Sequence, residues 1–97
     1  MNRQQYLLTK LAEEAAEVSQ IALKSQVFGL SEVQPNTDVS NASRIYGELN
    51  DLLSIVKMLN DEFTDEFYFE PSEEAYNRKK EKVKYYYEYS KSLGLTE

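Results

Sequence analysis

Cysteine and histidine are both absent from this sequence of 97 residues. Without cysteine there are no disulfides and no thiolate metal sites, so helix packing or self-association must stabilise a thin core. Without histidine, serine–histidine and cysteine–histidine pairs, imidazole zinc ligands and the Glu-x-x-His motif of di-iron bundles are excluded. Any catalysis therefore relies on carboxylates, lysines and tyrosines.

Glycine and proline are scarce, and long apolar runs are missing. With 41% hydrophobic and 29% charged residues, the composition is typical of a globular, helix-rich domain. No stretch approaches the roughly 20 apolar residues that span a bilayer, and no basic-then-apolar signal segment opens the chain. We expect a single domain over residues 1–97, cytoplasmic and without a membrane partner.

Positive charge is also in short supply. The chain carries 11 basic and 17 acidic side chains, for a net charge of −6. Proteins whose main task is to bind nucleic-acid phosphates are usually basic, so no nucleic-acid partner is expected. If this protein binds phosphates, a cation must mediate.

Three segments have the apolar spacing of amphipathic helices. The first runs from residue 2 to about 28, the second holds residues 45–63 after a cap at Ser40 or Asn41, and the third covers 73–93. Residues 31–40 have turn composition, whereas residues 61–70 fit either an extension of the second helix or an aromatic connector. The sequence predicts an all-α antiparallel bundle of about three main helices, completed by homo-oligomerisation.

The first segment places a carboxylate within its apolar stripe. The stripe, centred on Leu11, comprises Leu7, Leu11, Ala15, Val18 and Ala22. At about 100° per residue, Glu14 lies about 60° from Leu11 and Glu17 about 120° away on the same side, whereas Glu13 points away from the core. The second segment repeats this pattern around Leu52.

In that second segment Glu48 lies about 40° from Leu52, and Asp51 lies about 100° away on the same side. If the two helices pack, Glu14, Glu17, Glu48 and Asp51 converge. Single acidic residues usually belong to solvated helix faces, and Lys10 could pair with Glu14. A cluster of four nevertheless calls for a strong cation, and Mg²⁺, which prefers oxygen ligands, fits such a site; Mn²⁺ is an alternative.

The acidic residues of the first two segments belong to two short motifs. Residues 11–17, LAEEAAE, and residues 48–53, ELNDLL, resemble the paired EExxE and ExxD motifs of MazG-like nucleotide pyrophosphohydrolases. The likeness covers residues 5–60, and residues 75–95 more loosely resemble the last helix of the small members. Two features depart from the pattern: the gap between the motifs is long, and Asn50 stands where many members have glycine or alanine.

The resemblance implies an all-α fold, a homodimer or homotetramer, and catalytic Mg²⁺ held by Glu14, Glu17, Glu48 and Asp51. Glu13 would then serve as an outer support or as the general base. The implied reaction is hydrolysis at the α-phosphorus of a nucleoside triphosphate to monophosphate and pyrophosphate, as in nucleotide-pool housecleaning. The alternatives are dUTP or phosphoribosyl-ATP hydrolysis by similar acids, or a non-enzymatic helical adaptor that dimerises through the same stripes.

The third segment offers counter-charges. With Val83 as reference, Lys79 and Lys80 lie within about 60° of it and could reach substrate phosphates, although their stems could equally cover apolar surface. Tyr76 and Tyr87 are predicted on the core side. The tyrosines of residues 85–89 are expected to form core and interface contacts rather than to stack on a base.

Overall fold

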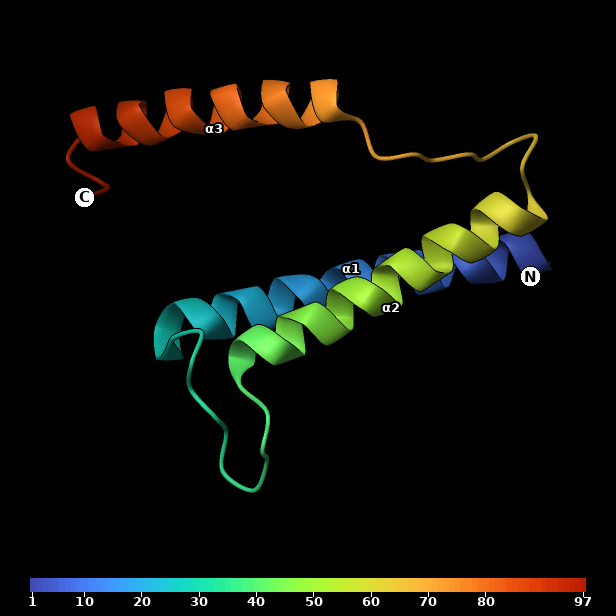
Figure 1. Ribbon diagram of the computed structural model, residues 1–97, viewed down its shortest axis with the longest axis horizontal. Helices are drawn as coiled ribbons and strands as arrows, with labels where there is room; N and C mark the ends of the chain where they lie inside the picture. The colour runs from blue at the N-terminus through green and yellow to red at the C-terminus, as the bar shows by residue number, and fades with distance from the viewer.

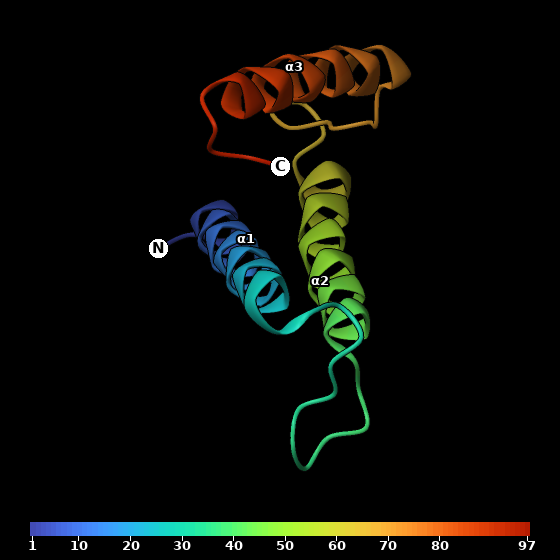
Figure 2. The same cartoon turned by 90° about the vertical axis from the view of Figure 1, so that its left-hand side faces the viewer.

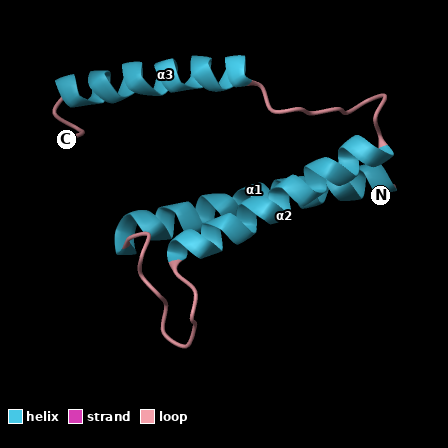
Figure 3. Ribbon diagram, viewed as in Figure 1, coloured by secondary structure: helices cyan, strands magenta, loops and turns pink.

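Two long antiparallel helices and a separate third helix make up the chain in the computed structural model, which describes all 97 residues (Figure 1). Helix α1 spans Arg3–Phe28, α2 spans Asn41–Glu62 and α3 spans Glu73–Ser92. The remainder is loop, without a strand (Figure 3). The all-α prediction is therefore confirmed, and each predicted helix lies within a few residues of its expected position.

Side-chain caps define where the helices begin. The Asn2 side chain accepts a hydrogen bond from the Gln5 amide at 2.8 Å, and the Gln5 side chain accepts one from the Asn2 amide in return. Ser40, not Asn41, caps α2, because its Oγ accepts from the Ser43 amide. Gly29 ends α1 with a φ of 96°, a conformation that residues with a Cβ rarely adopt.

The α1–α2 hairpin holds the buried core of the molecule. Leu7 and Leu59 are 2% and 1% exposed, and Ile21 is also buried between the helices. At the open end, the Arg3 guanidinium donates two hydrogen bonds to the Glu62 carboxylate, at 2.9 and 3.0 Å. This contact joins the first turn of α1 to the last turn of α2.

The buried face of α1 differs from the predicted stripe. Ala15 and Ala22, predicted near its centre, are exposed, whereas Ile21 and Ser25 are buried. The face is therefore turned by about 50° toward Glu14. The physical reason is that alanine buries little area, so the larger leucine and isoleucine side chains determine how the helix rotates against its neighbour.

The loop between α1 and α2 is fastened at its base. Asn41, 1% exposed, donates from its side-chain amide to the Gly29 carbonyl at 2.8 Å. The Asn41 and Ala42 amides donate to the carbonyls of Glu32 and Leu30, both at 2.9 Å. These bonds hold the end of α1 beside the start of α2.

Residues 63–72 form the aromatic connector, which was one of the two alternatives for residues 61–70. Helix α2 ends at Glu62, and one turn over residues 64–66 precedes an extended segment. The Asn60 side chain donates to the Phe69 carbonyl at 2.9 Å and accepts from the Phe69 amide at 2.8 Å. This pair of bonds ties Phe69 back to the last turn of α2.

Helix α3 lies apart from the hairpin (Figure 2). Ser72 caps its start, but the helix makes no contact with α1 or α2. Tyr76 and Tyr87 are 59% and 46% exposed, so the prediction that they lie on a core side is wrong for a single copy. The position of α3 depends on contacts with other elements, which the spacing of apolar residues within one helix does not encode. None of the three helices is long and apolar enough to span a membrane.

Candidate metal centre

The hairpin brings three of the four predicted ligands together. Glu14 and Glu17 lie one turn apart on α1, and Glu48 faces them from α2. One carboxylate oxygen from each residue lies within 4.8 Å of the other two. Opposite ligands of an octahedral Mg²⁺ are about 4.2 Å apart, so small side-chain rotations bring these oxygens into coordination range.

Two oxygens of this cluster are buried without a partner. Glu14 and Glu48 are half-buried, and the Oε2 atom of each is enclosed and has no hydrogen-bond partner in the protein. Glu17 is exposed at the rim. Buried polar atoms are normally hydrogen-bonded, so the two unpartnered oxygens fit ligands of a cation.

The carboxylates destabilise one another's charge. Burial raises the pKa of Glu14 above its ordinary value, and the charges of Glu17 and Asp51 raise it further. The pKa of Glu48 is raised first by a hydrogen bond with Glu17, which requires a shared proton, and then by burial. A divalent cation would relieve both effects, because it replaces the proton as the positive partner.

Asp51 and Glu13 occupy the two sides of the cluster. Asp51 is exposed one turn after Glu48, outside the three-oxygen group but near enough to raise the pKa values of Glu14 and Glu48. Glu13 accepts a hydrogen bond from Lys10 at 3.1 Å and is exposed. Lys10 therefore pairs with Glu13, and no ion pair involves Glu14.

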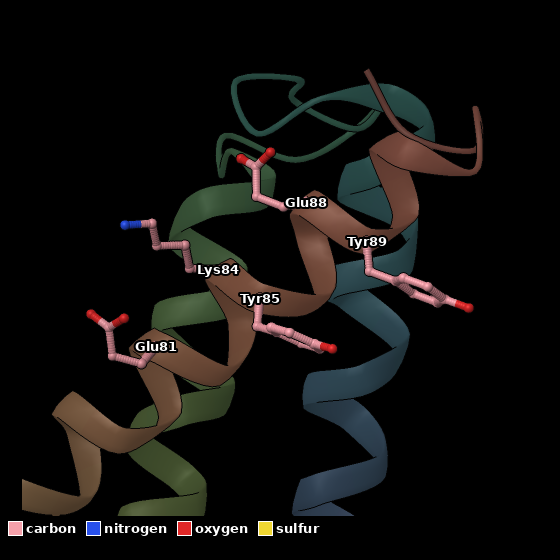
Figure 4. Close-up of a pocket in the computed structure, with 5 residues that line it drawn as sticks. All are labelled: Glu81, Lys84, Tyr85, Glu88 and Tyr89. Atoms are coloured by element: carbon pink, nitrogen blue, oxygen red, sulfur yellow. The ribbon is translucent and has the colours of Figure 1, made fainter.

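The predicted phosphate ligands Lys79 and Lys80 do not reach this cluster within one copy. Both are exposed on α3, which makes no contact with the hairpin. A hollow on α3 is lined by Glu81, Lys84, Tyr85, Glu88 and Tyr89 (Figure 4). All five lie on the same helix, with Tyr85 and Tyr89 projecting to one flank, so this hollow is a furrow along one helix rather than a cleft.

Two cations near the acids were missed by the sequence analysis. Lys24 and Arg44 line a pocket of about 120 Å³ together with Glu17 and Glu48. Arg44 precedes Glu48 by four residues and therefore shares its helix face, a signal that was available in the sequence.

No family model, no curated protein and no solved structure matches the chain. The resemblance of its two acidic motifs therefore rests on the residues of those motifs alone.

Proposed function

We propose that the protein is a Mg²⁺-dependent nucleoside triphosphate pyrophosphohydrolase of the MazG-like kind, releasing monophosphate and pyrophosphate. The observation that carries this proposal is the convergence of Glu14, Glu17 and Glu48 from two helices, with two buried oxygens unpartnered. Mn²⁺ is the alternative ion. The same acids could serve dUTP or phosphoribosyl-ATP hydrolysis, which a substrate panel distinguishes.

The chain's own residues would perform two tasks in this reaction. Glu14, Glu17 and Glu48, whose carboxylates converge from the two helices, would hold the ion, and Asp51 would extend the negative field at the exposed edge. When bound, Mg²⁺ would neutralise the triphosphate and favour ionisation of the attacking water. The helices fix the positions of the ligands before substrate arrives, so little reorganisation is needed.

We also infer that the site works in a homo-oligomer. Around the axis of each hairpin helix, one acid lies about 70–90° to one side of the buried face: Glu17 on α1 and Asp51 on α2. On each helix, exposed apolar residues lie about 70–110° to the other side of that face. This outer apolar face comprises Leu8, Ala15, Ala22, Leu49 and Leu53. A second copy can cover it without blocking the acids on the opposite flank.

Charge supports a partner contact by α3 as well. Residues 1–72 carry five basic and twelve acidic side chains, a net charge of −7, whereas α3 carries six basic and four acidic, a net charge of +2. The helix therefore complements the hairpin of a second copy. In such an assembly Lys79 and Lys80 would have a route to the phosphates that they lack within one chain.

The adaptor alternative makes a different prediction for the acids. If they were only solvated surface, Glu14 and Glu48 would have no reason to bury an unpartnered oxygen each. The two interpretations are separated by following the products of nucleoside triphosphates with Mg²⁺ by phosphorus NMR.

In that assay we expect pyrophosphate and monophosphate from the wild type. Mutating a group that only orients a metal ligand typically lowers metal affinity or activity by about 10–100-fold. Because Glu48 and Asp51 are proposed to act on the ion directly, Glu48→Gln and Asp51→Asn should lower turnover by roughly 100-fold or more. Glu88→Gln on α3 is the matched surface control. Orthophosphate as the only product, unchanged activity in both variants, or no turnover of any nucleotide would favour the adaptor.

A further inference from the structure

A small pocket adjoins the acid cluster on the side nearer the 29–40 loop. Its volume is about 120 Å³, and its lining comprises Glu17, Gln20, Ile21, Lys24, Arg44 and Glu48. Lys24 follows Glu17 by seven residues and Arg44 precedes Glu48 by four, so in the antiparallel hairpin both cations are displaced toward the loop. The pocket therefore has an acidic end and a basic end.

The two ends do not neutralise each other. The four ion pairs of the chain involve other residues, so neither Lys24 nor Arg44 lies within 4.0 Å of a carboxylate. Arg44 is half-buried, and its Nη1 atom is enclosed without a hydrogen-bond partner in the protein. A guanidinium presents five donors in a fixed fork, so a buried one is normally matched by acceptors. Cations that only balanced the acids would contact them directly.

We propose that Lys24 and Arg44 form an anion subsite for a phosphate group whose other oxygens face the divalent ion of the acid cluster. The inference rests on the proposed metal site and deepens it. Arg44 would supply the planar fork that suits phosphate oxygens, and Lys24 a point charge. Metal and phosphate together would satisfy the unpartnered atoms at both ends of the pocket, namely Glu48 Oε2 and Arg44 Nη1.

The size of the pocket limits what part of a ligand it holds. Sites that enclose a whole small molecule usually measure about 300–1,000 Å³, more than the 120 Å³ found here. The pocket therefore takes a phosphate group and leaves a sugar and base outside. Recognition within it is of phosphate charge and geometry, which predicts tolerance of different bases.

The test is calorimetric titration of the Mg²⁺-saturated protein with inorganic pyrophosphate. A charge-assisted hydrogen bond contributes enough that losing one weakens binding about tenfold, so Arg44→Gln and Lys24→Gln should each lower pyrophosphate affinity by about that factor. Lys57→Gln is the matched control, because Lys57 is an exposed cation on α2 that pairs with Asp61. Circular dichroism verifies folding, and Lys24→Gln suffices if Arg44→Gln does not fold.

The outcomes separate this subsite from the metal site. Weakened pyrophosphate binding, with the Mg²⁺-induced rise in melting temperature retained, supports the subsite. Wild-type pyrophosphate affinity in both variants, with that rise retained, overturns the subsite and leaves the metal site standing. A wild type that shows no response to Mg²⁺ overturns both.

Discussion

The position of Glu48 between two helices changes the pKa of its carboxyl group. Its pKa is raised by the hydrogen bond with Glu17 and by burial, so the folded state binds protons more tightly than the unfolded chain. The resulting stability is present at pH values below the ordinary pKa of 4.5 and is lost as pH rises through the raised value. Glu62 behaves oppositely, because a hydrogen bond from Arg3 lowers its pKa.

Without divalent ions, Glu48→Gln should melt at a higher temperature than the wild type at neutral pH. Glutamine keeps the shape of the side chain and removes the charge that Glu14, Glu17 and Asp51 oppose. The difference should shrink as the pH falls, because protonation of Glu48, favoured by its raised pKa, removes the same charge. Thermal unfolding followed by circular dichroism at several pH values measures it, with Glu62→Gln as a control that should give no stabilisation.

Mg²⁺ should reverse that order of stabilities. At a concentration about 100 times its dissociation constant, a ligand that binds only the folded state adds about 2.7 kcal/mol. The wild type should gain this stability, whereas Glu48→Gln and Glu14→Gln should gain little. A wild type indifferent to Mg²⁺ and Mn²⁺ would show that the carboxylates do not form a metal site.

Among the elements, the hairpin depends on contacts at both of its ends. Arg3 and Glu62 join the open end, and the Asn41 side chain joins the loop end through the Gly29 carbonyl. Because Asn41 is 1% exposed, no water can replace its donor without a rearrangement. These contacts keep the α1–α2 register that sets Glu48 against Glu14.

Asn41→Ala should lower the free energy of unfolding by about 1–3 kcal/mol, since it leaves a backbone carbonyl without its partner. Urea unfolding measures the change. Asn50→Ala is the control, because Asn50 is an exposed asparagine on α2 whose side chain makes no hydrogen bond in the structure. Equal stability of the two variants would show that the Asn41 contact does not hold the loop.

The helices were predictable because their signals are local. Caps such as Ser40 and Ser72, and the stop at Gly29, act within one or two turns. Periodicity also predicted that Glu14, Glu17 and Glu48 converge, as they do between the two helices. It missed the rotation of α1 toward Glu14, because the larger leucine and isoleucine side chains rather than the alanines set that rotation. The position of Arg44 beside Glu48 follows from their spacing of four residues, which the apolar periodicity alone does not include.

At the scale of the whole molecule, a single chain buries few of its residues. Five of its 97 residues are buried, and its radius of gyration is 17.1 Å, whereas a compact chain of about 100 residues has roughly 13 Å. The separation of α3 from the hairpin accounts for the excess (Figure 1). The cap and periodicity of α3 are local signals, so they predicted the helix itself but not its separation from the hairpin.

We predict that light scattering will give the mass of an oligomer, two or more times the 11.3 kDa of one chain. Leu53→Glu, which places a charge on the outer apolar face, should shift the protein toward monomer. Ser54→Glu adds the same charge at the next residue, away from that face, and should leave the mass unchanged. A monodisperse 11.3 kDa wild type at micromolar concentration would contradict the assembly.

In the reaction that we propose, the acids of the hairpin direct water to the α-phosphorus of a nucleoside triphosphate. Hydrolysis with Mg²⁺ in oxygen-18 water tests it directly, because the attacking water's oxygen stays on the phosphorus that it attacks. Attack at the α-phosphorus breaks the bond to the bridging oxygen, which leaves with pyrophosphate. Mass spectrometry should therefore find the label in the nucleoside monophosphate and none in pyrophosphate. Label in pyrophosphate or orthophosphate, or no product, would show that the hairpin acids do not direct attack at the α-phosphorus.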